Sequence, residues 1–273
     1  DGLLTITNCQ TNGDVTISTN AKAMSVDTSS FGGLVGYCGN GAIVKDCTNN
    51  GEVAWALNGG SSKNYDCHVA GLVARIVGGN SEISNCHNKG KVFNKHYNNK
   101  EFDTTYRNNL AAGVLGSFGA STSTSGTITI ANCTNIASVN AYRGGAAGIA
   151  GYGSSDVTIK NCGVAANIIG STRYGAMLGN FWGGTQTVNN CYSVGTTFSN
   201  YRAFTGSNNY STEDCLKGTI TKLSVEQMSG ADARLNMPSL NLFGTTDTYP
   251  VIFQQGTVGK AWTGSIAQKY AGG

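Results

Sequence analysis

The sequence has few charged residues and almost no proline, and it contains no long apolar run. Only 12% of its 273 residues are charged and only two are proline, whereas roughly 25% of an ordinary globular protein is charged. No apolar stretch approaches the roughly 20 residues that span a bilayer, so we expect no membrane insertion. The net charge of +3 comes from scattered Lys and Arg without a basic run, which argues against nucleic acid as a partner.

The sequence also lacks the short motifs that mark common catalytic and cofactor sites. It contains no HExxH, GxSxG, P-loop or dinucleotide-binding pattern. Two Cys-His dipeptides, Cys67-His68 and Cys86-His87, could suggest zinc, but neighbours on a strand point to opposite faces and make a poor chelate. We therefore expect a protein without enzyme activity, cofactor or metal.

What the sequence does have is 39 glycines and a repeated unit of three segments. The glycine segment is a small residue, two apolar residues and a second small residue, as in Gly33–Gly36. The cysteine segment alternates in polarity and ends in Asn or Asp followed by Cys, as in Val44–Cys47. The valine segment is Gly-x-Val, as in Gly51–Val53. Glycine supplies the turns between the segments because it accepts positive φ.

This repeat predicts an all-β fold, a parallel three-sided β-solenoid or β-helix. Each segment is typical of a short strand, and strands of successive coils would pair about 4.8 Å apart. We take the coil as right-handed by default. The main alternative is a propeller, but the spacing from Cys133 to Cys162 to Cys191 is shorter than a four-stranded blade of roughly 40–50 residues.

One cysteine per coil predicts a ladder along one face of the solenoid. The apolar residue and the Cys of the cysteine segment cannot both point inward on a flat strand. A corner at the intervening Asn or Asp, which tolerates the left-handed backbone conformation, would resolve this conflict. We expect these corners at Asn8, Asp46, Asn85, Asn132, Asn161 and Asn190, and the ladder at Cys9, Cys47, Cys86, Cys133, Cys162 and Cys191.

The ladder cysteines are interpreted as small, buried and reduced. Parallel Cβ atoms one strand spacing apart lie beyond the roughly 3.5–4.5 Å that a disulfide needs. Disulfide, metal and redox roles stay open as alternatives. Cys38 and Cys67 lie outside the ladder and form the one extra pair that could be bridged, and Asp214-Cys215 resembles a last, degenerate copy of the cysteine segment.

In Gly33-Leu34-Val35-Gly36 and Gly71-Leu72-Val73-Ala74 the sequence resembles the GLUG-motif repeat family, over residues 2–197. The resemblance implies a surface or secreted repeat protein, of a kind that accompanies peptidase and adhesin modules, with no catalytic residue set. We therefore expect an extracellular or cell-surface location. Because the chain opens at Asp1, we expect either that a leader has been removed or that this is a piece of a longer protein.

The repeat pattern predicts two regions, the solenoid at residues 1–215 and a C-terminal capping segment at 216–273. An open solenoid end is a bare sheet edge that needs a cover. Ser224 and Gln227 fit a capping box, which predicts a short helix from Val225. The N-terminal coil begins without a glycine segment, so its edge could pair with another molecule.

Three long connections predict where function lies: residues 16–32, 54–70 and 93–112. On successive coils they would emerge side by side, and loops on a rigid scaffold often carry binding sites. Their aromatic and polar side chains suit adhesion, or recognition of a glycan or a host protein. The candidate ligand-binding residues are Trp55, Tyr65, His68, Phe93, His96, Tyr97, Phe102, Tyr106 and Arg107.

Three alternatives remain. The aromatic side chains could pack the loops onto the coil without binding anything. The solenoid ends could stack head to tail into filaments, which would make this a structural protein. Finally, Glu101 with Asp103, or Glu213 with Asp214, could be the carboxylate pair of a carbohydrate-active β-helix enzyme.

Overall fold

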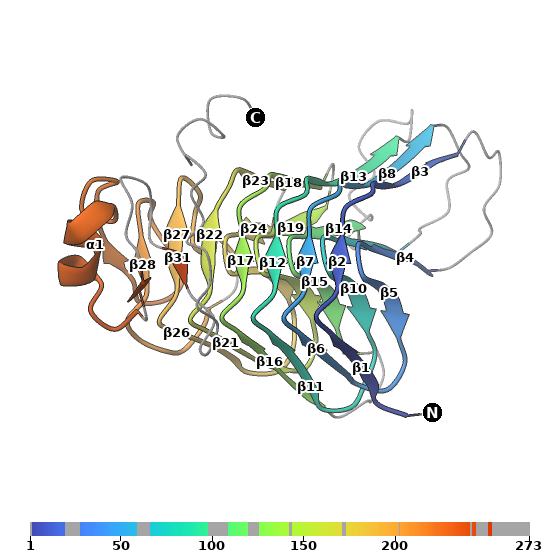
Figure 1. The fold of residues 1–273 in the computed structure, drawn as a ribbon, viewed down its shortest axis with the longest axis horizontal. Coiled ribbons are helices and arrows are strands. Elements are labelled where there is room, and N and C mark those ends of the chain that lie inside the picture. Colours follow the sequence, from blue (N-terminus) through green and yellow to red (C-terminus); the bar gives the residue numbers. More distant parts are fainter. Residues whose placement is uncertain are drawn as a thin grey trace.

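The protein is a parallel β-solenoid, which confirms the fold class that the repeat predicts. The computed structural model describes residues 2–19, 28–58, 66–97, 109–119, 126–141, 144–170, 173–201, 203–240, 242–243 and 251–252. Successive coils stack along the long axis of the molecule, and the strands of its five large sheets pair in parallel (Figure 1). The apolar core fills the inside of the coil.

Five sheets, named A to E in the order in which the chain passes through them, form the wall of the coil. Sheet A contains β1 (Leu4–Thr7), β6 (Ala42–Lys45), β11 (Ser81–Ser84), β16 (Thr127–Ala131), β21 (Asp156–Lys160) and β26 (Gln186–Asn189). Sheet B contains β2 (Gln10–Thr11), β7 (Thr48–Asn49), β12 (His87–Asn88), β17 (Thr134–Asn135), β22 (Gly163–Ala165), β27 (Tyr192–Val194), β28 (Tyr210–Ser211) and β29 (Thr221–Lys222).

The other three large sheets have five strands each. Sheet C contains β3 (Val15–Thr19), β8 (Val53–Asn58), β13 (Val92–Tyr97), β18 (Val139–Ala141) and β23 (Ile168–Gly170). Sheet D contains β4 (Thr28–Gly32), β9 (Asp66–Ala70), β14 (Asn109–Ala112), β19 (Gly145–Ala147) and β24 (Arg173–Gly175). Sheet E contains β5 (Val35–Cys38), β10 (Val73–Ile76), β15 (Leu115–Phe118), β20 (Ala150–Gly153) and β25 (Leu178–Phe181).

The remaining elements lie toward the C-terminus. They are α1 (Gly230–Asn236) and an antiparallel pair of short strands, β30 (Leu242–Phe243) and β31 (Val251–Ile252). No helix among the described residues has the length and apolar character that crossing a membrane would need.

Each coil is divided more finely than the repeat of three segments predicts. In the second coil, Gly71 and Leu72 of the glycine segment form the bend between β9 and β10 instead of a strand of their own. The residues before this bend form β9, and the two residues after Cys47 form β7. The coil therefore has five short strands, because the bend in the glycine segment and the corner before the cysteine each break a longer stretch.

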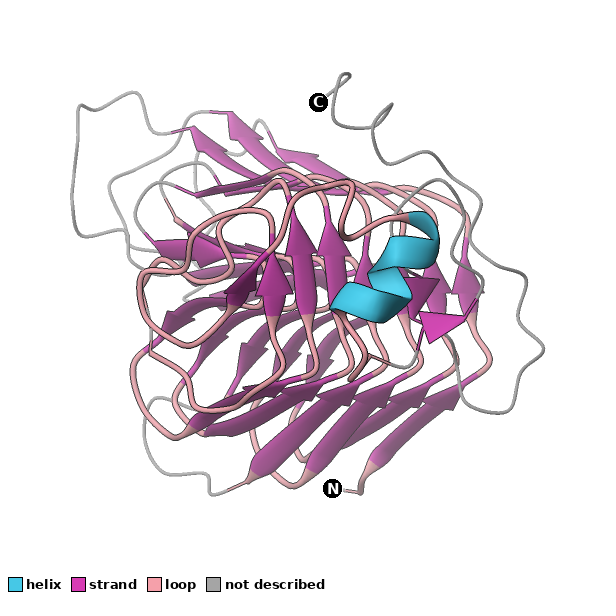
Figure 2. Cartoon of the chain, turned by 90° about the vertical axis from the view of Figure 1, so that its left-hand side faces the viewer, coloured by secondary structure: helices cyan, strands magenta, loops and turns pink. Residues whose placement is uncertain are grey.

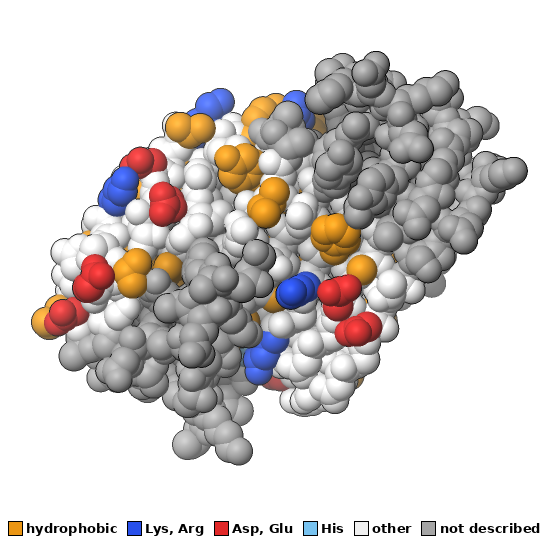
Figure 3. Space-filling view, turned by 90° about the horizontal axis from the view of Figure 1, so that it is seen from above, with side chains coloured by type: hydrophobic (Ala, Val, Ile, Leu, Met, Phe, Trp, Pro, Cys, Tyr) orange, Lys and Arg blue, Asp and Glu red, His pale blue; other side chains and the backbone are white. Residues whose placement is uncertain are grey.

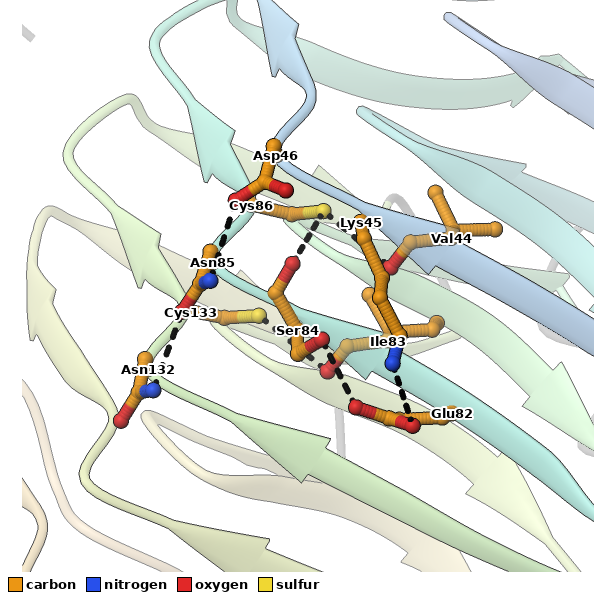
Figure 4. Close-up of polar contacts among 10 residues, drawn as sticks. All are labelled: Val44, Lys45, Asp46, Glu82, Ile83, Ser84, Asn85, Cys86, Asn132 and Cys133. Carbon is orange, nitrogen blue, oxygen red and sulfur yellow. Dashed lines mark hydrogen bonds and ion pairs between the residues drawn. The ribbon is translucent and has the colours of Figure 1, made fainter. Parts of the chain in front are cut away.

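An Asn or Asp turns the chain before each ladder cysteine, as predicted. The six corner residues named above all have φ between 53° and 56°. Their side chains bond along the solenoid: the Asn85 amide donates to Asp46 Oδ1 at 3.0 Å, and the Asn132 amide donates to Asn85 Oδ1 at 3.0 Å (Figure 4). The corner lets both Ile83 and Cys86 point into the core, where both are buried.

A second asparagine ladder lies inside the coil and has no counterpart among the predicted features. Asn49, Asn88 and Asn135 follow the ladder cysteines by two residues and are completely buried. The Asn49 amide donates to Gly51 O at 2.8 Å and to Asn88 Oδ1 at 2.9 Å, and Asn88 bonds in the same way to Gly90 O and Asn135 Oδ1. These bonds satisfy the side-chain N–H groups of Asn49 and Asn88, which would be costly to bury alone.

This inner ladder explains the first glycine of the glycine segment. A Cβ atom at Gly71 would overlap Asn88 Oδ1 and the carbonyl oxygen of Gly113, and one at Gly33 would overlap Asn49 Oδ1 and the carbonyl oxygen of Gly71. The glycine is needed because the buried amide and the neighbouring coil leave no room for a side chain.

The C-terminal end of the core is closed by Phe198 and Phe204. Their rings are 5.4 Å apart and both side chains are buried. The chain that follows covers the outer face of sheet B near this end, where Met228 and Met237 pack against Tyr192. Seen from that end of the coil, α1 lies in front of the last strands (Figure 2).

Two expectations for this end are wrong in detail. The last copy of the corner is Asn208-Asn209, not Asp214-Cys215: Asn208 has φ 57°, and Asn209 Oδ1 accepts the Cys191 N–H at 3.1 Å. An asparagine amide can replace the thiol as the acceptor on this rung, which the cysteine pattern could not indicate.

The helix also begins later than predicted. Ser224 and Gln227 form both bonds of the capping box, from Ser224 N to Gln227 Oε1 at 2.9 Å and from Gln227 N to Ser224 Oγ at 3.3 Å. They close only a single turn, because the backbone of Ser229 is extended and breaks the helical conformation. The helix α1 therefore starts at Gly230.

Candidate functional site

Four of the nine residues predicted as ligand contacts lie outside the described residues. This holds for Tyr65, Phe102, Tyr106 and Arg107. His96 and Tyr97 belong to β13, whose backbone pairs with β8 as far as Tyr97 opposite Asn58. The connections that follow β8 and β13 therefore start side by side on successive coils.

Trp55, a predicted ligand contact, packs in the core. Its side chain is only 2% exposed, and its ring lies 5.5 Å from that of Phe31. The residue sits inward in sheet C, opposite Asn94 of the next coil. Phe93 is half-buried on the other face of the same sheet. Of these two aromatic side chains, only Phe93 could reach a ligand.

His68 points away from the core, yet it is also buried. Cys67 and Val69, its neighbours in β9, belong to the core, so His68 occupies the outer face of sheet D. It is 3% exposed, and its ring lies 6.2 Å from that of Tyr152. Burial, and secondarily the charge of Arg75, lower the pKa of His68 to about 3, so the imidazole is neutral at ordinary pH.

A row of polar and aromatic residues on the outer face of sheet E is the strongest candidate site. Successive coils place these residues opposite one another, and we call them the sheet E row: Tyr37, Arg75, Ser117, Tyr152 and Asn180. Each directly follows a copy of the glycine segment in the sequence, so an alignment of the repeats would locate the row. Its five members comprise four residue types, and for that reason no single motif marks it.

Exposed aromatic rings lie at both ends of the row. At one end Tyr37 is 58% exposed, and the Arg75 guanidinium lies 5.9 Å from the centre of its ring. At the other end Tyr152 lies 6.5 Å from Trp182, which is 46% exposed. Three strand spacings of about 4.8 Å put Tyr37 and Tyr152 roughly 14 Å apart. The row is thus longer than one sugar ring and lies along the solenoid axis.

The middle of the row contains buried polar atoms that have no hydrogen-bond partner among the described residues. Ser117 is 1% exposed, and its Oγ lacks such a partner. His68 lies beside the row, and its Nδ1 also lacks one. A buried polar atom that lacks a partner costs free energy, and such atoms in a native structure often indicate a ligand or an ordered water.

The row ends at a cationic cluster. Arg173 of sheet D donates to Asn180 Oδ1 at 2.6 Å, and its guanidinium lies 4.2 Å from the centre of the Tyr201 ring. The Lys217 ammonium lies 5.9 Å from the same ring. Positive side chains therefore lie both within the row and at its C-terminal end.

The outer face of sheet A carries an open depression of about 780 Å³. Lys45 and Glu82 form an ion pair across it at 3.0 Å, and Ser84 donates to the same carboxylate at 2.9 Å (Figure 4). These contacts, Lys45 first, lower the pKa of Glu82. The central polar groups are thus already paired with each other, and a carboxylate with a lowered pKa is a poor general acid.

Of the two other carboxylate pairs considered for catalysis, only Glu213 with Asp214 lies among the described residues. Glu213 and Asp214 are exposed, and Asp214 forms an ion pair with Lys222 at 2.9 Å. Glu101 and Asp103 lie outside the described residues. The described residues also contain no group of three His, Cys, Asp or Glu side chains that could hold a metal ion.

The surface seen from above shows no dominant patch. Over the described residues of this face, charged side chains of both signs occur singly or in small groups, and hydrophobic side chains are separated from one another (Figure 3). This is consistent with the low charge of the sequence.

The cysteines form no disulfides, and most of their thiols are buried. None of the nine forms a disulfide, Cys38 and Cys67 included, and five of the six ladder members are buried. The Cys133 N–H points at Cys162 Sγ at 3.5 Å, so the thiols interleave with the backbone of the next coil. Burial raises the pKa of the Cys133 and Cys191 thiols, whereas hydrogen bonds with the neighbouring ladder thiols lower the pKa of Cys86 and Cys162. Because all four thiols are buried, a reagent in solution reaches none of them in the folded protein.

Comparison with known proteins gives one structural neighbour. No protein-family model and no curated protein sequence matches the chain. A crystal structure described as that of a putative immunoglobulin A1 protease from Bacteroides ovatus is similar with a TM-score of 0.49 and 18% sequence identity, over 88% of this chain and 74% of that chain.

Proposed function

We propose that this protein is a non-catalytic recognition module that binds glycans at a cell surface or outside the cell, with the sheet E row as its contact surface. The observation that carries the proposal is the pair of aromatic ends on one face: exposed Tyr37 at one end, and half-buried Tyr152 beside exposed Trp182 at the other. Aromatic rings offer flat apolar faces to sugar rings at a low cost in conformational entropy.

The solenoid scaffold supports this proposal. Each row residue is fixed by parallel pairing to the neighbouring coils, so the side chains need little ordering when a ligand arrives. An extended oligosaccharide along the solenoid axis could touch both aromatic ends at once. The resemblance to GLUG-motif repeats, and the surface or secreted location that it implies, is consistent with such a ligand.

The test is glycan-array binding followed by titration calorimetry on the best oligosaccharide. Tyr37→Ala and Trp182→Ala should each weaken binding by about tenfold, since the stacking of one ring contributes roughly 1–2 kcal/mol. Leu216→Ala is the matched control, because Leu216 is an exposed apolar side chain outside the row. If the wild-type protein binds no glycan, or if all three variants bind equally well, the proposal fails.

Self-association through the solenoid ends is the second candidate. In the described residues, the strands of the first coil each have a neighbour on one side only. At the opposite end, Phe198 and Phe204 close the core, which disfavours head-to-tail stacking. Light scattering over a range of concentrations separates the two candidates: growth into filaments would favour assembly, and a constant mass would favour recognition.

A further inference from the structure

The centre of the sheet E row combines a cation with buried hydrogen-bonding groups. Arg75 is half-buried, and it forms no ion pair with any carboxylate of the described residues. Its nearest described neighbours in the row are Tyr37 and Ser117, the partners of Arg75 in the adjacent coils. A guanidinium beside neutral groups leaves its positive charge available to an anion.

The groups beside Arg75 can donate hydrogen bonds to the same anion. Ser117 Oγ and His68 Nδ1 both lack a hydrogen-bond partner within the described part of the chain, and both side chains are more than nine-tenths buried. A neutral imidazole donates from one ring nitrogen, and a hydroxyl rotates to donate. Partial burial strengthens the attraction between Arg75 and an anion, because little water separates them.

We propose that this centre, formed by Arg75, Ser117 and His68, takes the acidic group of a sugar within an oligosaccharide. The inference rests on the proposed function and specifies its ligand class as anionic glycans. The chemistry shared by the ligands is a planar or tetrahedral oxyanion on a pyranose ring, either a carboxylate or a sulfate. The guanidinium fork fits the two oxygens of such a group, while Tyr37 and Tyr152 lie on either side for the neighbouring sugars.

The test compares three oligosaccharides with the same backbone: neutral, carboxylated and sulfated. The wild-type protein should bind at least one acidic form about tenfold more tightly than the neutral form, and Arg75→Gln should remove that difference while keeping the binding of the neutral form. Arg75→Lys should restore only a fraction of it, because the ammonium lacks the fork. Ser117→Ala should also lower the preference for the acidic ligand.

Lys91→Gln is the matched control, because it removes the same charge from an exposed position away from sheet E. It should leave all three affinities unchanged, and circular dichroism should confirm that each variant is folded. If Arg75→Gln and Lys91→Gln weaken acidic ligands equally, the attraction is non-specific and the inference is wrong. If neutral and acidic forms bind equally, the inference is wrong and the proposed function stands; if nothing binds, both fail.

Discussion

Single asparagine residues decide the shape of the coil. Each corner asparagine adopts the left-handed backbone region, which costs most residues roughly 1–2 kcal/mol. The amides of Asn85, Asn132 and Asn161 also donate to the equivalent side chain of the preceding coil. Asparagine therefore stabilises the corner in two ways: it tolerates the left-handed backbone conformation, and its side chain forms the amide ladder. Substitutions can separate these two effects.

Asn132 offers this separation. Asn132→Gly and Asn132→Ala both remove the amide bonds to Asn85 and Asn161, but only alanine is strained at φ 55°. Asn132→Ala should therefore be less stable than Asn132→Gly by about 1 kcal/mol. Chemical denaturation of both variants measures the difference. A glycine variant less stable than the alanine variant would show that backbone strain does not govern the corner.

Thiol reactivity should follow position in the cysteine ladder. Cys9 is exposed in the first coil, whereas the other ladder cysteines are buried. Cys215 is half-buried, and burial raises its thiol pKa. A thiol reagent at neutral pH should modify Cys9 first, Cys215 slowly and the buried cysteines only after unfolding, which mass spectrometry can follow. Rapid labelling of Cys86 or Cys133 in the folded protein would be inconsistent with the ladder described above.

The buried neutral His68 should make folding sensitive to acid. Its pKa is about 3 in the folded state, against 6.5 for an ordinary histidine, so the unfolded chain binds the proton more readily. The stabilising effect is complete above pH 6.5 and is lost as the pH falls toward 3, with a slope of about 1.4 kcal/mol per pH unit for one proton.

Denaturation at several pH values tests this. Arg75 of β10 and Tyr152 of β20 are the described titratable groups that face His68. His68→Asn should therefore show a shallower loss of stability over that interval. Equal slopes for the wild type and the variant would mean that His68 is protonated in the folded protein.

At the scale of elements, the bend between sheets D and E depends on the inner asparagine ladder. The bend in the glycine segment approaches the buried amide so closely that only glycine fits. The same bend determines where each sheet E strand begins, and so determines which residues form the sheet E row. This glycine therefore links the inner asparagine ladder to the position of the sheet E row on the outer surface.

Gly71→Ala should break this bend. Its Cβ would overlap Asn88 Oδ1 and the backbone of the next coil, so we expect a loss of about 2 kcal/mol or more in the free energy of unfolding. Gly13→Ala is the control, because a Cβ there meets nothing within 4 Å; it should change stability by less than about 0.5 kcal/mol. Similar losses in both variants would show that the close approach is not what requires glycine.

At the scale of the whole molecule, the repeat predicted the architecture because its features depend on local chemistry. The clash between strand periodicity and the positions of Ile83 and Cys86 predicted a corner at Asn85, and the structure has one. The end of the coil was harder to predict, because Asn209 replaces the cysteine there and Phe198 closes the core without any repeat signature.

The candidate site was less predictable than the fold. Trp55 belongs to a segment rich in aromatics, but strand alternation turns it into the core, where it contacts Phe31. The members of the sheet E row are far apart in sequence and unlike in type, and only the pairing of coils brings Arg75 beside Ser117. The candidate site depends on which residues the stacked coils bring together, and the amino-acid composition does not show this.

The most direct measurement is a backbone and side-chain NMR map of the protein with an acidic oligosaccharide. We predict that chemical-shift changes concentrate at Tyr37, Arg75, Ser117, Tyr152 and Trp182, with no change at Lys45 and Glu82 on sheet A. Changes confined to the sheet A depression, or to residues 98–108 of the third long connection, would instead show that the sheet E row is not the binding surface.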